Sequence, residues 1–190
     1  MPSLACIVEG QGDVASIPII VRRIAHEQGV YDVTLQVYRV HRQTVVRTGE
    51  LERAVDRAAR SLERPGGILV VLDADDDLPC ELGPALTARA HDARRDTTSR
   101  VVMAMREKEA WYLAAAESLR EVRGFPTDLL PPANPEAVRG AKEWLSRASG
   151  RPYSAVADEP ALASIFSMEL ARTRAPSFAR FYRSVTDLLA

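Results

Sequence analysis

Cysteine is scarce in this sequence, which contains only Cys6 and Cys80. One lies in a predicted core strand and the other in a predicted loop. Two such cysteines form neither a disulfide framework nor the ligand spacing of a zinc site. We therefore expect a protein of the reducing cytoplasm.

Long apolar runs are absent as well, because no segment approaches the roughly 20 residues that a membrane span requires. The first residues, MPSLACIVEG, lack a basic region followed by a long apolar stretch,. We expect a chain that is neither secreted nor membrane-spanning.

A surplus of one charge is also missing, since 25 basic residues stand against 26 acidic ones. No overall field therefore indicates nucleic acid or an anionic membrane as a partner.

What the sequence does contain is a regular alternation of short apolar runs with helical patterns. The predicted strands are 4–8, 33–40, 68–72 and 100–105. Helices are predicted from about Val14, from about Thr48 until Pro65-Gly66-Gly67, over 83–95 and from Arg106,. Such alternation predicts an α/β fold with a parallel four-stranded sheet covered by helices.

The composition changes beyond Gly124, where a proline-rich stretch runs through Pro135. Proline cannot continue a helix or a central strand, so we place a boundary there. The sequence then predicts a catalytic core over 1–124 and a C-terminal helical extension over 125–190, packed on the core. Helices are expected near 136–148, 159–172 and 176–189. The oligomeric state, including a homo-oligomer, stays open.

Acidic residues follow two of the predicted strands directly. Glu9 comes after the first strand, and Asp73-Ala74-Asp75-Asp76-Asp77 comes after the third. Because the carboxyl ends of parallel strands lie at one edge of the sheet, these acids should converge there. Mg²⁺ prefers such hard oxygen ligands and retains several waters, so Asp73 and Asp75 are the preferred ligands, with Mn²⁺ as a substitute ion.

Three other interpretations compete with a metal site. The acidic loop could simply be solvated and cap the next helix, as Asp13 could cap the first one. The spacing Gly10-x-Gly12-x-x-Ala15 matches a permissive dinucleotide fingerprint, but acids flank it,. Asp73-x-Asp75 would also suit a phosphatase with an aspartyl nucleophile, although those enzymes usually carry the pair on the first strand.

Two motifs together resemble the signatures of the Toprim superfamily of topoisomerases, primases and nucleases of the overcoming-lysogenization-defect type. They are Val8-Glu9-Gly10-x-Gly12-Asp13 and Leu72-Asp73-Ala74-Asp75-x-Asp77, within residues 4–105. The chain looks closest to small bacterial Toprim-like proteins of unknown function, in which an acid-and-tryptophan segment such as 106–113 follows the fourth strand and the tail ends in an aromatic-rich helix. The resemblance implies a Toprim-like, Rossmann-like core.

The resemblance also implies roles for individual residues. Glu9 would be the general acid or base and a metal ligand, Asp73 and Asp75 the metal-binding pair, and Asp77 a further ligand. Asp13, Glu107 and Glu109 would be auxiliary, although Glu107 and Glu109 could equally favour a helix N-terminus. Beside the acidic edge lie three basic candidates for contacts to a nucleic-acid backbone: His41, Arg42 and Arg47,.

Three functions remain open at this point. The first is a Mg²⁺-dependent nuclease that hydrolyses phosphodiester bonds in DNA or RNA, in bacterial antiphage defence, where related Toprim domains work with an ATPase partner. The second is a non-catalytic or partner-activated effector that docks on an ATPase. The third is a metal-dependent phosphotransfer enzyme for a small phosphorylated molecule, which a closed pocket would favour.

Overall fold

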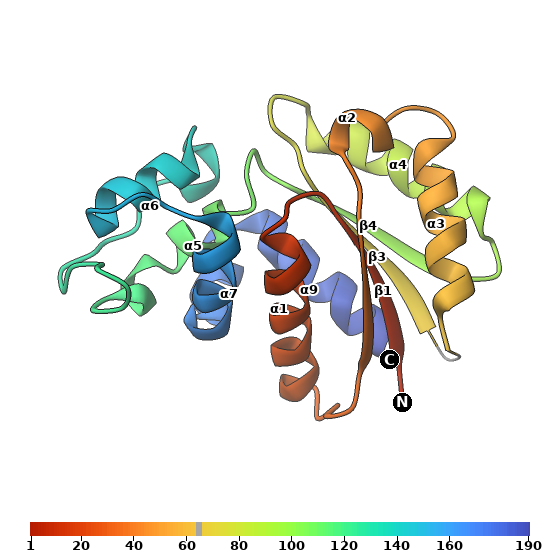
Figure 1. Ribbon diagram of the computed structural model, residues 1–190, viewed down its shortest axis with the longest axis horizontal. Coiled ribbons are helices and arrows are strands. Elements are labelled where there is room, and N and C mark those ends of the chain that lie inside the picture. Colours follow the sequence, from red (N-terminus) through yellow and green to blue (C-terminus); the bar gives the residue numbers. More distant parts are fainter. Residues whose placement is uncertain (64–65) are drawn as a thin grey trace.

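The computed structural model describes residues 1–63 and 66–190 and has an α/β architecture (Figure 1). Its four strands form a single parallel sheet in the order β2-β1-β3-β4. The strands are β1 Ser3–Val8, β2 Thr34–Arg39, β3 Gly66–Asp73 and β4 Thr98–Ala104. The predicted fold class is therefore confirmed. Pro65, part of the predicted helix stop, lies outside the described residues.

The two central strands, β1 and β3, are apolar on both faces because helices cover the sheet on both sides,. Val8 pairs with Val71, and Asp73 pairs with Ala104, so β1, β3 and β4 end close to one another. This register brings the residues after β1 and those after β3 to the same edge of the sheet.

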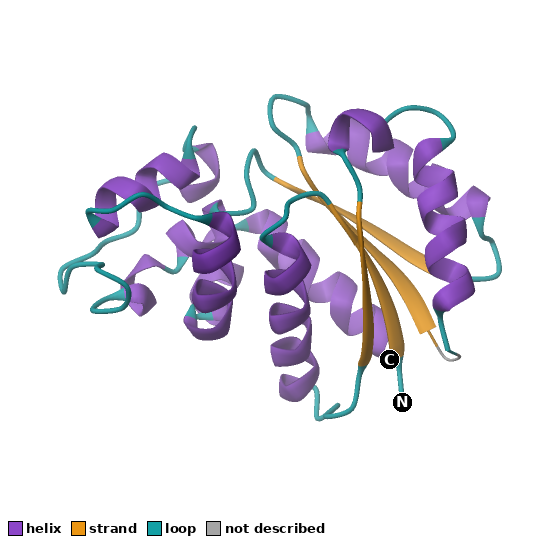
Figure 2. Ribbon diagram, viewed as in Figure 1, coloured by secondary structure: helices purple, strands orange, loops and turns teal. Residues whose placement is uncertain are grey.

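Helices α1, Asp13–Glu27, and α9, Pro176–Leu189, cover one face of the sheet (Figure 2). From α1 the buried contacts include Ile17, Ile20 and Ile24, at the spacing of one helix face,. Leu4, Cys6 and Val8 of β1 point to this side, together with Leu69 and Val71 of β3.

Helices α3, Glu50–Ser61, and α4, Pro79–Ala93, cover the other face. Ala5 and Ile7 of β1 point to this side, because side chains alternate along a strand,. The short helix α2, Arg42–Val45, lies here as well. This helix lies between the predicted strand 33–40 and the helix predicted from about Thr48, and its Val45 is buried in the core and anchors the segment.

The remaining elements form a helical lobe beside the sheet. They are α5 Ala110–Ala114, the 3₁₀ turns η1 Ala116–Leu119 and η2 Pro135–Ala137, α6 Ala141–Ser149, α7 Ala155–Ile165 and α8 Met168–Arg174. The single helix expected over 159–172 is thus two helices. The hydroxyl of Ser167 accepts a hydrogen bond from the Leu170 N–H at 3.2 Å and starts the second of them,.

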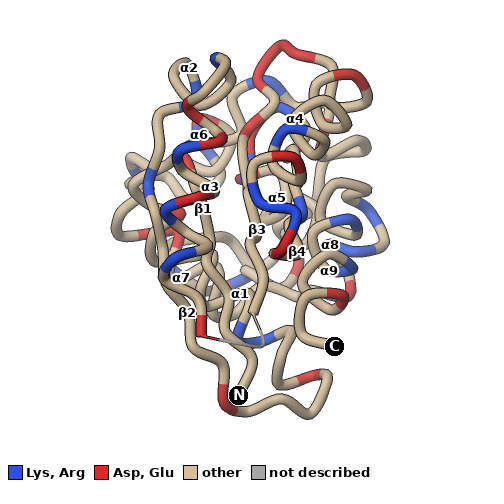
Figure 3. Tube along the Cα trace, turned by 90° about the vertical axis from the view of Figure 1, so that its right-hand side faces the viewer, with Lys and Arg blue, Asp and Glu red and all other residues tan. Residues whose placement is uncertain are grey.

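Charge is distributed without segregation of sign. Figure 3 shows basic and acidic segments interspersed along the chain trace, in keeping with the formal net charge of −1. Within residues 1–63 and 66–190, no helix combines the length and the apolar character needed to cross a membrane.

Candidate functional site

The carboxyl edge of the sheet gathers the acids that the sequence singled out. Glu9 directly follows β1, and Asp73 is the last residue of the adjacent β3. Their side chains nevertheless leave the sheet on opposite faces. Glu9 continues the alternation of Ala5 and Ile7, whereas Asp73 continues that of Leu69 and Val71,. Two neighbouring sites result.

The first site is a cleft of about 500 Å³ on the α3/α4 side. Its lining residues are Glu9, His41, Arg42, Gln43, Thr44 and Asp75. Atom Oε2 of Glu9 is buried and has no hydrogen-bond partner among the described residues. Burial raises the pKa of Glu9, and the charge of Asp75 raises it further, although a backbone hydrogen bond from Asp73 and the charge of Arg42 act in the opposite direction,.

Arg42 fixes the acidic loop that bounds this cleft. Its Nε donates to the carbonyl of Asp73 at 2.8 Å, and its Nη2 donates to the carbonyl of Ala74 at 3.0 Å. The same guanidinium contacts the carboxylates of Asp75, at 3.5 Å, and Asp77. A phosphate contact of Arg42, as the sequence predicted, would therefore have to replace some of these partners.

The other two basic candidates differ in position. His41 is exposed and lines the cleft next to Arg42. Arg47 is also exposed, but it does not belong to the lining of this cleft. A nucleic-acid contact by either residue stays a prediction.

The second site lies on the α1 side and contains Asp73 and Asp13. Oδ1 of Asp73 accepts a hydrogen bond from the backbone N–H of Lys108 at 2.8 Å. Burial, followed by the charges of Glu109 and Asp13, raises the pKa of Asp73 well above its usual range. Asp13 accepts the N–H of Gly10 at 2.7 Å, so it closes the turn after β1 in addition to facing Lys108.

Sequence reasoning missed the partner that holds the second site together, Lys108. Its ammonium is buried and lies 3.1 Å from Oδ1 of Asp13 and 2.7 Å from Oε2 of Glu159. The hydroxyl of Ser16 donates a hydrogen bond to the same oxygen of Glu159 at 3.1 Å. A signal for Lys108 existed, because lysine occurs only twice in this arginine-rich chain. Nothing local singled out Glu159, which is 51 residues away.

The auxiliary acids Glu107 and Glu109 connect the core to α6. Oε1 of Glu107 accepts the N–H of Ala141 at 3.1 Å, at the first turn of α6. Lys142 lies 3.2 Å from Glu107 and 3.2 Å from the buried Glu109. Burial raises the pKa of Glu109 to about 7, although Lys108 and Lys142 lower it. Glu107 thus contacts the N-terminus of α6, and an auxiliary role of Glu107 and Glu109 at the metal site stays a prediction.

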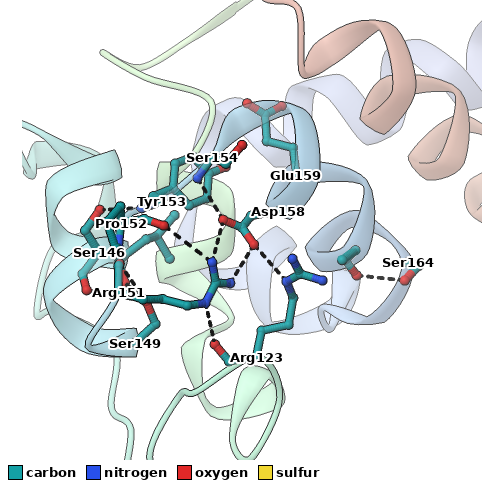
Figure 4. Close-up of polar contacts among 12 residues, drawn as sticks. Arg123, Ser146, Ser149, Arg151, Pro152, Tyr153, Ser154, Asp158, Glu159 and Ser164 are labelled. Carbon is teal, nitrogen blue, oxygen red and sulfur yellow. Dashed lines mark hydrogen bonds and ion pairs between the residues drawn. The ribbon is translucent and has the colours of Figure 1, made fainter.

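Asp158, next to Glu159 on α7, anchors the lobe. Its buried carboxylate accepts hydrogen bonds from Arg123 at 2.7 Å, from Arg151 at 2.5 and 3.1 Å, and from the N–H of Ser154 at 2.8 Å. Figure 4 shows Glu159 turned away from this cluster. Adjacent acids of one helix thus bind the lobe on one side and the core on the other.

The sheet edge supplies some of the oxygen ligands that a hard cation such as Mg²⁺ needs. The unpartnered oxygen of Glu9 and the carboxylate of Asp75, 57% exposed, share one cleft,. Among the described residues, however, no group of three or more His, Cys, Asp or Glu side chains is arranged to hold a metal ion. Oδ1 of Asp73 and Oδ2 of Asp77 already accept hydrogen bonds, from the N–H of Lys108 and from Arg42, so a cation bound at these oxygens would compete with them.

Comparison with known proteins gives one match. The model of a family described as a domain of unknown function, DUF4276, matches residues 8–186, nearly the whole chain. Neither a curated protein nor a solved structure matches significantly. The resemblance to the Toprim superfamily stays a prediction.

Proposed function

The chain belongs to the DUF4276 family, and we propose that it is a Mg²⁺-dependent nuclease that hydrolyses phosphodiester bonds in DNA or RNA. The observation that carries the proposal is the buried, unpartnered Oε2 of Glu9. A buried acceptor without a donor costs free energy unless a proton or a cation satisfies it. Asp75 in the same cleft supplies a second oxygen donor for that cation.

Glu9 and Asp75, which line the same cleft, would hold the ion, and water would complete its coordination,. A bound Mg²⁺ would act as a Lewis acid toward the phosphate oxygens and would lower the pKa of an attacking water. Glu9 would accept the proton of that water, which is the general-base role that the resemblance to the Toprim superfamily implies. His41, which lines the cleft, would contact the substrate backbone. Hydrolysis then leaves a phosphate monoester and a hydroxyl on the two product strands.

A cleavage assay tests the proposal. The purified protein is incubated with single- and double-stranded DNA and RNA in Mg²⁺, in Mn²⁺ or in EDTA. We expect metal-dependent cleavage that falls 10²- to 10⁴-fold in Glu9→Gln. A comparable loss is expected in Asp75→Asn, where asparagine keeps the backbone conformation of Asp75, φ 51°,. Asp92→Asn, an exposed acid of α4, is the matched control and should cleave normally. Equal cleavage by Glu9→Gln and the unaltered protein would refute the assignment.

A partner-activated effector is the second candidate, and the contacts of Arg42 favour it. Its guanidinium already neutralises Asp75 and Asp77, so a cation must compete with a resident positive charge. An ATPase partner that draws Arg42 away would free both carboxylates, in keeping with a role in antiphage defence. Under this alternative the isolated protein does not cleave, and Arg42→Gln raises its affinity for Mg²⁺ in calorimetric titration.

A further inference from the structure

A second cleft, of about 140 Å³, shares the lining residue Asp75 with the cleft that contains Glu9. Its lining residues are Asp75, Asp76, Arg106, Glu107, Arg139 and Gly140. Arg106 follows β4, whereas Arg139 precedes α6. Both arginines direct Nη1 at the same oxygen, Oδ1 of Asp76, at 3.3 and 2.7 Å. Two guanidinium groups from distant parts of the chain thus share one exposed carboxylate.

The fold holds Arg106 in this place at a cost. Its backbone is left-handed, with φ 58°, which disfavours any residue with a β-carbon,. Its carbonyl accepts the N–H of Asp75 at 3.0 Å, so the loops after β3 and β4 are joined at this point. Its Nε is buried and has no hydrogen-bond partner in the described part of the chain,. A strained backbone at a residue that lines a cleft favours a functional role for that residue,.

We propose that Arg106 and Arg139 bind a phosphate of the polynucleotide strand next to the phosphodiester that is cleaved, and that Asp76 occupies them when no strand is bound. The inference rests on the proposed nuclease function. A phosphate offers several acceptor oxygens, which suit two forked guanidinium groups better than the single shared oxygen of Asp76 does.

The arrangement of the two clefts favours a strand over a small phosphorylated molecule. Asp75 lines both clefts, so they meet at one residue that is a candidate metal ligand. A polynucleotide carries a phosphate on each side of any given bond, and a strand that crosses Asp75 can occupy both clefts. A small molecule that carries a single phosphate can place that phosphate in only one of the two clefts.

Binding is measured by fluorescence anisotropy with a labelled 20-nucleotide phosphorothioate strand, which resists cleavage, in EDTA and in Mg²⁺. Asp76→Asn should lower Kd about fivefold, the size of one charged contact at a partly exposed site. Asp92→Asn removes the same charge from another exposed ion pair, Arg95–Asp92 at 2.8 Å, and should change Kd less than twofold. Arg139→Gln should raise Kd about fivefold and reduce the salt slope by about 0.7.

A second variant separates binding from folding. Arg106→Gly removes the guanidinium but relieves the left-handed backbone, so it should unfold at the same or a higher urea concentration while Kd rises,. Equal effects of Asp76→Asn and Asp92→Asn, or an unchanged Kd in Arg139→Gln, would overturn the proposal. The proposal would also be overturned if Arg139→Gln weakened the binding of inorganic phosphate but not the binding of the strand. Binding is measured with a strand that resists cleavage, so it does not depend on nuclease activity. If the unaltered protein binds the strand but cleaves no substrate, the nuclease assignment is refuted and the binding result stands.

Discussion

Lys108 keeps its charge in the interior because acidic groups surround it. Burial alone would lower the pKa of Lys108, but Tyr112, Asp13 and Glu159 raise it well above the usual range. The ammonium hydrogen-bonds to Ser16 and Glu159, at 3.2 and 2.7 Å. The same residue orients Asp73 through its backbone N–H. Lys108 therefore supports both the interior network and the acid at the end of β3.

We predict that Lys108→Met strongly destabilises the protein. The substitution keeps an unbranched side chain that is one atom shorter, but it leaves Asp13 and Glu159 as buried carboxylates without their cation. Removal of one member of a buried ion pair costs about 3–5 kcal/mol of the free energy of unfolding, which urea denaturation would measure. Arg95→Met, at an exposed ion pair, is the matched control and should change stability by less than about 1 kcal/mol,. Similar losses in both variants would contradict the assigned role of Lys108.

Glu109 predicts a specific dependence of stability on pH. Burial raises its pKa from 4.5 to about 7, so the folded protein retains a proton that the unfolded chain releases between these two pH values. Its contribution is fully present below pH 4.5 and is lost as the pH rises to about 7. The difference in unfolding free energy between the unaltered protein and Glu109→Gln should therefore fall by up to about 3 kcal/mol over this interval. Denaturant titrations at several pH values would check this, and a constant difference would rule out the raised pKa.

At the scale of elements, the strands and several helices were predictable from pattern alone. Apolar runs between charged turns located all four strands to within two residues, because β1, β3 and β4 are largely buried and β2 is half-buried,. Helix α9 begins at Pro176 and ends at Leu189 as expected, since proline favours a first turn,. The break between α7 and α8 was not predictable. Phe166 leaves the helix to pack against Tyr112 and Phe178, a contact set by tertiary structure.

The site was predictable only to the level of the sheet edge. Parallel strands placed Glu9 and the loop after Asp73 side by side, and the structure has them there. The alternation of strand side chains could also have indicated that Glu9 and Asp73 diverge. The pairing of Lys108 with Glu159, and of Arg106 and Arg139 with Asp76, depends on where the lobe packs. No local pattern encodes that packing.

The hydrogen bonds of Asp158 predict how much this residue contributes to the stability of the fold around α7. Burial opposes its ionisation, but hydrogen bonds from Arg151, Ser154 and Arg123 lower its pKa below the usual range. Asp158→Ala leaves two guanidinium groups without their shared partner, and we expect a loss of about 2–4 kcal/mol at pH 7. Because the pKa of Asp158 is lower in the folded protein than in the unfolded chain, its carboxylate stabilises the fold at pH values above the unfolded pKa. The difference in unfolding free energy between the two proteins should therefore shrink as the pH falls below about 4. Chemical denaturation at pH 7 and pH 3 would measure it.

A control distinguishes this anchor from a general effect of charge. Glu169 is an exposed acid at the start of α8, and Glu169→Ala should change stability by less than about 0.5 kcal/mol,. If Asp158→Ala behaved in the same way, the cluster in Figure 4 would not anchor α7.

At the scale of the whole molecule, one apolar core crosses the boundary that the proline-rich stretch suggested. A single cluster of buried side chains joins β1 and α1 to Leu145, Phe166, Phe178 and Phe181. Leu188 of α9 packs so closely on β3 that a β-carbon at Gly67 would lie 2.6 Å from its Cδ2. The C-terminal helix is therefore part of the layer that covers the sheet, although it is separated from 1–124 in sequence.

This continuity predicts that residues 1–124 do not fold by themselves. Without α9, the faces of β3 and β4 that it covers are exposed, together with Trp111, whose ring packs on Phe178 and Phe181. Exposed apolar surface of this kind promotes aggregation and loss of fixed packing. We expect the fragment to lack near-ultraviolet circular dichroism and a cooperative urea transition, both of which the full chain should have. A fragment that unfolds cooperatively would instead establish 1–124 as a domain, with residues 125–190 as an attachment to it.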